Sequence, residues 1–286
     1  MITEHASKIK KYAPSWLYKL ASQAWFDKRY PRHLFIETTA ACNLNCSYCP
    51  REKIKDSMDF GLFTAILDEA SRYGSRSFSL HLFGEPLLYP RMADAIRYIK
   101  FKNRRHVVLL TTNGTQLERL ADEIVSLPID QIFWTWRPEV KWKEKTKERL
   151  RKWGRFRVRF IEELTPAEAY REWSGWKNVE RRKLHNYGEI ELQKFGVQST
   201  AGPRWPCYHL WLAPAVAWNG KFLMCCSDPH QKEVFGDINR ESVSECWQRL
   251  HEIRKSHLEG KYSGICRDCN VWKQYPDMFF SWQRTI

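Results

Sequence analysis

Short apolar runs and longer amphipathic stretches alternate along most of this chain. The runs predict strands at 33–39, 76–83, 106–112, 131–136, 155–161 and 178–185. Between them, apolar residues at helical spacing predict helices at 60–73, 90–102, 115–126, 139–153 and 166–175. Strands that alternate with helices form parallel sheets, because the chain must cross back over the sheet before each new strand. We therefore expect an α/β fold built from repeated strand–helix units.

The pattern changes at both ends of this repeat. Residues 8–28 predict a basic amphipathic helix, which we expect to pack as a lid over the sheet and not on a membrane surface. From residue 186 onward, a turn-rich stretch leads into a part that holds six of the nine cysteines. We divide the chain into an N-terminal segment (1–32), a strand–helix domain (33–185) and a linker with a small cysteine-rich extension (186–286).

Alternation within two strands separates a face that meets helices from a face that points inward. In SFSLHLF the apolar positions 78, 80 and 82 pack outward, which leaves His81 and Phe83 inward. In RFRVRFI the apolar positions also pack outward and leave Arg155, Arg157 and Arg159 inward. Buried arginines need anionic partners, so they suit a phosphate or carboxylate ligand. The alternative is an edge strand whose arginines lie in solvent.

The overall charge narrows the choice of partners. A formal net charge of +14 favours an anionic partner such as nucleic acid, a nucleotide, a phosphorylated metabolite or a membrane surface. No apolar stretch is long enough to span a membrane, and the N-terminus lacks the apolar core of a signal peptide. Nine cysteines without an export signal indicate a reducing compartment, so we expect a cytoplasmic protein.

The stretch ACNLNCSYCP places three cysteines in one loop after the first predicted strand. Cys42, Cys46 and Cys49 are separated by three and then two residues, and no fourth cysteine lies beside them. A structural zinc site uses four ligands, so a zinc knuckle fits this spacing poorly. Three thiolates instead suit a cubane iron–sulfur cluster, in which they bind three irons and leave the fourth open to another ligand.

The C-x3-C-x2-C spacing, with Tyr48 before the last cysteine, resembles the signature of the radical S-adenosylmethionine (SAM) enzymes. Two later loops resemble further motifs of that family in the expected order. FGEPLL contains Gly84, Glu85 and Pro86, which correspond to the residues that hold the SAM amino group. TTNG resembles the family's Thr-Asn-Gly turn, which implies that Asn113 lies near the SAM ribose and methionyl part.

Two positions depart from the family pattern. Phe83 stands where the first glycine of the Gly-Gly-Glu-Pro motif often lies. In DQIFWTWRP, Thr135 stands where the family often has a serine that contacts SAM, and Arg137 replaces an aspartate. Thr135 keeps a hydroxyl and is carried over as a SAM contact, whereas Arg137 is a candidate contact for the substrate.

This resemblance implies a fold and a set of cofactors. The fold is a partial (β/α)6 TIM-like barrel with its site at the carboxyl ends of the strands. The cofactors are a [4Fe–4S] cluster and SAM, which the cluster cleaves reductively to a 5′-deoxyadenosyl radical. A reductase such as flavodoxin or ferredoxin would supply the electron.

The C-terminal part supplies a second set of cysteines: Cys207, Cys225, Cys266 and Cys269. Gly220, in an Asn-Gly dipeptide, predicts a hairpin turn between the first two of them. The layout resembles the SPASM and twitch extensions of radical SAM enzymes, which hold an auxiliary [4Fe–4S] cluster; zinc in the same thiols is the alternative. The spacing after Gly220 favours Cys225 over its neighbour Cys226 as the ligand, and Cys246 is expected in the core.

The leading hypothesis is a radical SAM oxidoreductase that takes a hydrogen atom from an anionic small molecule or nucleotide-like substrate. An auxiliary cluster that accepts an electron would make the reaction an oxidation, as in similar aminocyclitol-alcohol dehydrogenases. His81, Arg137, Arg157 and Arg159 are the candidate substrate contacts, and no catalytic acid or base is assigned.

Three alternatives stay open: modification of a peptide or protein, modification of nucleic acid, and a non-enzymatic iron–sulfur or zinc module that binds nucleic acid. The GEP and TNG motifs argue against the last, because a binding module needs no SAM pocket.

Overall fold

The computed structural model describes residues 26–187, 195 and 206–271. The helix predicted at 8–28 lies outside the described residues except for its last three positions, which are not helical. Most of the linker that follows residue 186 lies outside them as well.

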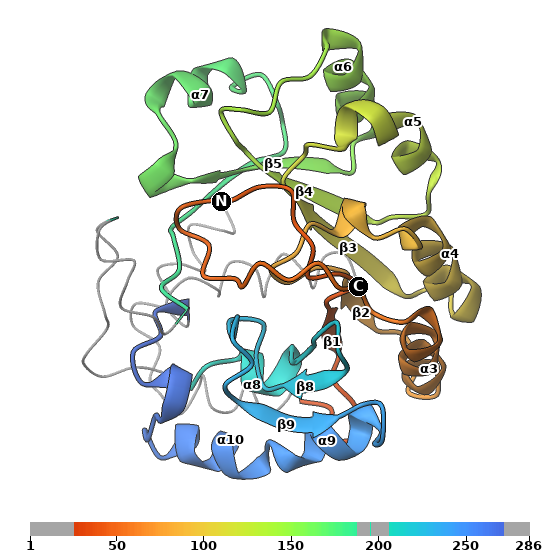
Figure 1. Cartoon of the computed structure of the whole chain (residues 1–286), viewed down its shortest axis with the longest axis vertical. Helices are drawn as coiled ribbons and strands as arrows, with labels where there is room; N and C mark the ends of the chain where they lie inside the picture. The colour runs from red at the N-terminus through yellow and green to blue at the C-terminus, as the bar shows by residue number, and fades with distance from the viewer. Residues whose placement is uncertain (1–25, 188–194, 196–205, 272–286) are drawn as a thin grey trace.

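The predicted strand–helix repeat is confirmed. Six parallel strands follow one another: β1 (His33–Ile36), β2 (Ser77–Ser79), β3 (Val107–Thr112), β4 (Gln131–Thr135), β5 (Phe156–Ile161) and β6 (Val179–Arg182). The helices between them are α3 (Phe60–Ser71), α4 (Met92–Lys102), α5 (Leu117–Ser126), α6 (Glu144–Trp153) and α7 (Ala167–Glu172). These helices lie along the outer side of the strands (Figure 1). Within the described part of the chain, no helix is long and apolar enough to cross a membrane.

The C-terminal extension continues the sheet of the barrel. It contributes β7 (Ala215–Val216), β8 (Lys221–Leu223) and β9 (Val234–Asp237), and the strand order over the described residues is β6-β5-β4-β3-β2-β1-β7-β8-β9. β7 pairs in parallel with β1, with Phe35 opposite Ala215 and Ile36 opposite Val216. β8 and β9 follow in antiparallel pairing. The cysteine-rich extension is therefore attached through β1, the strand that precedes the first cysteine loop.

The predicted hairpin turn lies between β7 and β8. Gly220 has a positive φ of 86°, a conformation that glycine adopts without steric cost. The remaining elements are α8 (His209–Leu212), α9 (Val243–Arg249), α10 (His251–Leu258) and the short 3-10 helices at Pro86–Leu88, Glu162–Leu164 and Gly264–Cys266. Leu250 separates α9 from α10, and both helices lie beside β9 (Figure 1).

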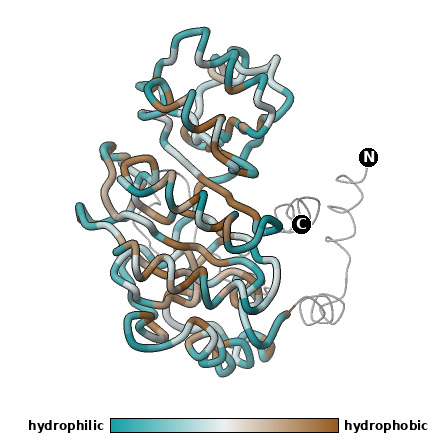
Figure 2. The backbone as a smooth tube through the Cα atoms, turned by 90° about the vertical axis from the view of Figure 1, so that its right-hand side faces the viewer, coloured by the Kyte–Doolittle hydropathy of each residue, from teal (hydrophilic) through white to brown (hydrophobic). Residues whose placement is uncertain are grey.

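The main core fills the space between the sheet and its outer helices. Phe78, Phe156, Val158 and Phe160 point outward from β2 and β5 and are fully or almost fully buried, as alternation predicts. Each such side chain contributes about 1.5–3 kcal/mol to stability through burial. Figure 2 shows hydrophobic stretches running through the middle of the molecule and hydrophilic turns at its margins.

Two details of the strand predictions are wrong. The strand expected at 76–83 ends at Ser79, because the chain turns out of the sheet after Leu80 to form the loop that carries Gly84. Arg155 does not point inward. β5 begins at Phe156, and the Arg155 guanidinium donates to the Ile129 carbonyl oxygen at 2.8 Å, at the edge where the strands begin.

Candidate functional site

The first cysteine loop follows β1 at the edge where the parallel strands end. Cys42, Cys46 and Cys49 are all partly exposed, and the Cys49 backbone N–H donates to the Cys46 carbonyl oxygen at 3.0 Å. The Arg51 guanidinium donates to the carbonyl oxygens of Cys42, at 3.4 Å, and Leu44, at 2.8 Å. These bonds fold the loop back on itself, so that one short segment presents three sulfur atoms.

The electrostatics of this loop fit a bound metal centre. Burial raises the pKa of the Cys49 thiol, and the neighbouring Cys46 and Cys42 raise it further. Three adjacent thiolates are therefore unfavourable by themselves, and a cationic iron centre would offset their repulsion. The donor set fits three-point ligation of a cluster.

The loop after β2 lies directly against the chain that leads into the cysteines. A Cβ atom on Gly84 would lie 1.9 Å from the Thr39 carbonyl oxygen, so no other residue fits without moving the backbone. The next backbone N–H, that of Glu85, donates to the Ala41 carbonyl oxygen at 2.7 Å. The glycine of the GEP motif thus allows the two loops to pack in contact.

The Glu85 carboxylate joins the second loop to the third. It accepts hydrogen bonds from the Thr112 hydroxyl at 2.6 Å, the Asn113 backbone N–H at 2.7 Å and the Leu87 backbone N–H at 3.1 Å. Burial raises the pKa of the Glu85 carboxyl to about 7, although these hydrogen bonds lower it. Pro86 then begins the 3-10 helix. In this structure Glu85 joins the second loop to the third, and a direct bond to the SAM amino group stays a prediction.

Asn113 connects the third loop to the cysteine loop. Its side-chain amide nitrogen lies 3.0 Å from the Asn43 amide oxygen and 3.8 Å from the Cys42 sulfur. Its amide oxygen accepts from the backbone N–H of Thr115 at 3.0 Å. The three loops that sequence motifs single out therefore meet at one edge of the sheet.

A pocket of about 360 Å³ opens beside the cysteine loop, and Cys46, Tyr48 and Arg137 are among the residues that line it. The Arg137 guanidinium carbon lies 5.2 Å from the centre of the Tyr48 ring. Its Nη1 donates to the Trp136 carbonyl oxygen at 2.7 Å, whereas its Nε is buried and makes no hydrogen bond to any described residue. Thr135, the predicted SAM contact, is 4% exposed at the end of β4.

The other candidate substrate contacts lie on the inner face of the sheet. Arg159 is 5% exposed, and β5 pairs with strands on both sides, so RFRVRFI is not an edge strand. The Arg159 guanidinium forms an ion pair with Glu180 and lies 4.2 Å from the centre of the Phe133 ring. The Glu180 carboxylate thus balances the charge of Arg159, which weakens the prediction that Arg159 binds the substrate.

His81 and Arg157 also contact protein groups. The His81 Nδ1 accepts from the Thr111 backbone N–H at 3.1 Å, and burial, with a smaller effect of Arg159, lowers the His81 pKa to about 3. Arg157 lies against the side-chain amide of Gln131. A role in substrate binding stays a prediction for both.

Sequence reasoning missed Glu37, which lies 5% exposed where β1 ends. Its carboxylate accepts from the backbone N–H of Phe83 at 3.2 Å, on the GEP loop, and of Trp218 at 3.4 Å, on the C-terminal hairpin. Burial raises its pKa to about 7. A charged residue inside the apolar run HLFIETT was the available signal.

The second set of cysteines surrounds one cavity. Cys207, Cys225, Cys266 and Cys269 all line it, together with His209 and His257. Burial raises the Cys207 pKa, and the other three thiols raise it further, so the four sulfur atoms lie close together. Four converging thiols fit a metal centre, because a cation would offset their mutual repulsion.

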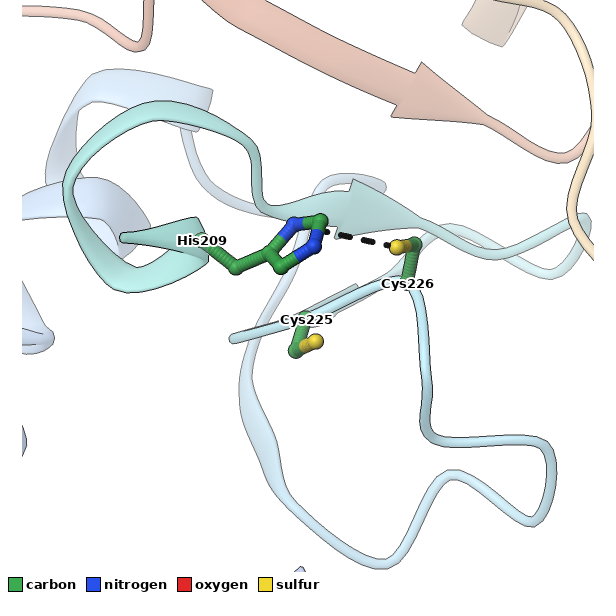
Figure 3. Close-up of side chains that lie close together, drawn as sticks. All are labelled: His209, Cys225 and Cys226. Carbon is green, nitrogen blue, oxygen red and sulfur yellow. Dashed lines mark hydrogen bonds between the residues drawn. The ribbon is translucent and has the colours of Figure 1, made fainter. Parts of the chain in front are cut away.

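Figure 3 shows how Cys225 and its neighbour Cys226 differ. Cys225 lines the cavity of the four thiols, whereas Cys226 does not, and its sulfur lies 3.9 Å from the Nδ1 of His209. The ligand atoms of His209, Cys225 and Cys226 lie within 4.8 Å of one another. The placement agrees with the choice of Cys225, and His209 is an additional donor that the spacing argument did not consider.

Two families match this chain. The radical SAM superfamily matches residues 36–134, and an iron–sulfur cluster-binding domain, SPASM, matches residues 207–270. The first range contains the cysteine loop and the two loops that pack against it. The second contains all four cysteines of the second cavity.

Individual relatives are similar over different lengths. A tungsten-containing aldehyde ferredoxin oxidoreductase cofactor-modifying protein of Pyrococcus furiosus is 31% identical over 109 residues, which are 36% of this chain and 30% of that protein. The S-adenosyl-L-methionine-dependent 2-deoxy-scyllo-inosamine dehydrogenase of Niallia circulans is 26% identical over 245 residues, 82% of this chain and 91% of that protein. The chain therefore spans less than a third of the first relative.

The fold is similar to solved structures over most of its length. The crystal structure of BtrN in complex with AdoMet and 2-DOIA superposes with a TM-score of 0.63 at 24% identity, covering 84% of this chain and 92% of that one. At this identity the likeness shows the fold alone. The two matched families, the order of the three loops and the two cysteine sets agree, and the chain belongs to the radical SAM superfamily and carries a SPASM domain.

Proposed function

We propose that this protein is an enzyme that removes a hydrogen atom from an anionic small molecule and oxidises it. The observation that carries the proposal is Arg137, in the pocket beside Cys46 and Tyr48, with a buried Nε that has no hydrogen-bond partner among the described residues. A buried donor without a partner costs about 1–3 kcal/mol. A carboxylate or phosphate of the substrate would satisfy it and bind the planar guanidinium at two points.

The cysteine sets would hold the cofactors that family membership implies. Cys42, Cys46 and Cys49 would ligate the cluster that binds SAM, and Cys207, Cys225, Cys266 and Cys269 would ligate an auxiliary cluster. When bound, these groups supply a SAM-derived radical that takes the hydrogen atom and an acceptor for the electron that the substrate loses next. The substrate gives up one hydrogen atom, one electron and one proton in total, which is a two-electron oxidation.

The protein's own residues would orient this chemistry. Arg137 would hold the anionic group of the substrate, while Asn113 and Glu85 keep the second and third loops against the cysteine loop. The Niallia circulans relative supports this outcome, because its name describes a SAM-dependent dehydrogenase. An external reductase such as flavodoxin or ferredoxin, and a cytoplasmic location, belong to the same proposal.

The test separates SAM cleavage from substrate binding. The reduced protein is incubated anaerobically with SAM and with deuterated anionic metabolites, and deuterium is measured in 5′-deoxyadenosine. Replacing Cys42, Cys46 and Cys49 together with alanine should abolish all SAM cleavage. Arg137→Gln should keep cleavage without substrate but weaken substrate binding about ten- to a hundredfold.

Arg151→Gln is the matched control, because Arg151 is exposed on α6 outside the pocket. Deuterium transfer that is equally strong in the Arg137 and Arg151 variants would rule out the anion-binding role. SAM cleavage that survives in the triple cysteine variant would rule out Cys42, Cys46 and Cys49 as the ligands of the SAM-cleaving cluster, whereas no SAM cleavage by the wild type would rule out the proposed enzyme.

A further inference from the structure

The edge at which the parallel strands begin carries a strip of arginines. Arg32 precedes β1, Arg76 precedes β2, Arg104 and Arg105 precede β3, and Arg155 precedes β5. Neighbouring strands lie about 4.8 Å apart, so the four steps from β1 to β5 extend the strip over roughly 19 Å. Arg76 is buried and paired with Asp27, so the exposed arginines of the strip are Arg32, Arg104, Arg105 and Arg155. Their spread suits an extended polyanion better than one small anion.

Acidic residues on this edge offset part of its positive charge: Asp27 pairs with Arg76, Asp94 lies 3.9 Å from Arg97, and Asp130, which precedes β4 and lines the pocket described below, pairs with Lys100. The Asp27 carboxylate lies 2.7 Å from the Arg76 guanidinium. The Asp130 carboxylate lies 2.6 Å from the Lys100 ammonium and also accepts from the Val108 backbone N–H at 2.7 Å. The exposed Arg104 and Arg105 add to a positive surface, in a chain whose net charge is +14.

One end of the strip opens into a pocket with an aromatic side chain. The pocket has a volume of about 510 Å³, and Arg97, Phe101, Arg104 and Arg155 are among its lining residues. Phe101 is 81% exposed on the last turn of α4. Among the described residues, the other large apolar side chains that lie exposed are Val179 and Val234, at 36% and 43%. An aromatic ring this exposed leaves apolar surface in contact with water, and a ligand stacked on the ring would bury that surface.

We propose that this surface binds a single-stranded nucleic acid, with a base stacked on Phe101 and phosphates on Arg97, Arg104 and Arg155. Non-specific single-strand sites combine these two elements, a positive groove for the backbone and an aromatic platform for a base. The surface lies where the strands begin, whereas the cysteine loop lies where they end. Binding here goes beyond the proposed oxidation and does not require it.

Two other partners fit the surface less well. An electron-donor protein needs to approach the cysteine loop, and the length of a strand, six residues in β3 or about 20 Å, separates that loop from the strip. A membrane would contact several protruding apolar side chains, whereas here one ring stands beside a pocket.

The test uses the full chain and a fluorescently labelled oligouridylate of about 20 nucleotides, titrated by anisotropy at about 50 and 200 mM KCl. Three phosphate contacts predict a slope of about −2 in log affinity against log salt, which is an affinity loss of about twentyfold between these concentrations. Phe101→Ala should weaken binding about five- to 150-fold at both concentrations, because stacking does not depend on salt. Arg104→Gln should reduce the slope by about 0.7.

Arg151→Gln, on α6, is the control for loss of an exposed arginine outside this surface and should leave the slope unchanged. SAM cleavage should be normal in the Phe101 and Arg104 variants, so failure of this proposal and failure of the proposed enzyme are separate results. Binding that Phe101→Ala does not weaken, or that vesicles of phosphatidylserine and phosphatidylcholine compete away, would overturn the proposal. Absence of binding at the lower salt concentration would overturn it as well.

Discussion

Replacing Glu37 with glutamine should change how the stability of the protein depends on pH. Burial raises the pKa of Glu37 to about 7 in the folded protein, against its ordinary value of 4.5. Between these two values the unfolded chain loses the proton while the folded protein keeps it. The free energy of unfolding of the wild type therefore falls as pH rises through this range and stays low above pH 7. The glutamine side chain of the variant has no proton to lose, so the variant lacks this contribution.

The size of the effect follows from the two pKa values. A tenfold change in proton affinity corresponds to about 1.4 kcal/mol, so the wild type loses about 3 kcal/mol of unfolding free energy over the whole transition. About 2 kcal/mol of this loss occurs between pH ~5.5 and ~8.5. Urea unfolding under anaerobic conditions, repeated across this pH range, measures the free energy of unfolding of wild type and variant. The test is how the difference between these two free energies changes with pH. Glu123→Gln, on the exposed surface of α5, is the control with the same change in charge. If the difference between wild type and E37Q is constant with pH, the buried-carboxylate reasoning is wrong.

Three further predictions concern residues of the site. Cys225→Ser should lower the iron content of the reconstituted protein by about half while Cys226→Ser leaves it unchanged, and the reverse result would exchange the two roles. Gly84→Ala should abolish SAM binding in equilibrium dialysis, because the new Cβ would meet the Thr39 carbonyl oxygen at 1.9 Å; wild-type affinity would contradict this. Arg159→Met should cost about 1.5–3 kcal/mol in urea unfolding by removing an ion pair, and a loss of substrate affinity without a loss of stability would favour the substrate role.

The parts of the fold that depend on local patterns could be predicted from the sequence. The predicted strands at 106–112 and 131–136 agree with β3 and β4 to within one residue, because charged or turn residues flank each apolar run. The strand at 76–83 was extended too far, since alternation in SFSLHLF continues after the chain has left the sheet. Periodicity describes which faces are apolar, and the Gly84 loop is apolar as well.

Long-range pairing could not be predicted in the same way. Nothing in the two-residue strand β7 indicates that it adds to β1, since a parallel pair needs no turn signal and joins distant segments. The same limit applies to the inner arginines. Alternation placed Arg159 on the inner face, but it could not reveal the ion pair with Glu180, which comes from β6. A role of Arg159 in substrate binding stays a prediction.

The pairing of β7 with β1 also sets the order in which the protein can be completed during synthesis. Val216 pairs with Ile36, which leaves the ribosome 180 positions earlier. At about 5–20 residues per second, the free edge of β1 waits roughly 9–36 s for its partner. An apolar strand with unpaired backbone groups is a template for aggregation, so we expect the nascent barrel to be prone to aggregation during this interval. For the same reason, a fragment cut before β7 should precipitate and not fold as an independent barrel.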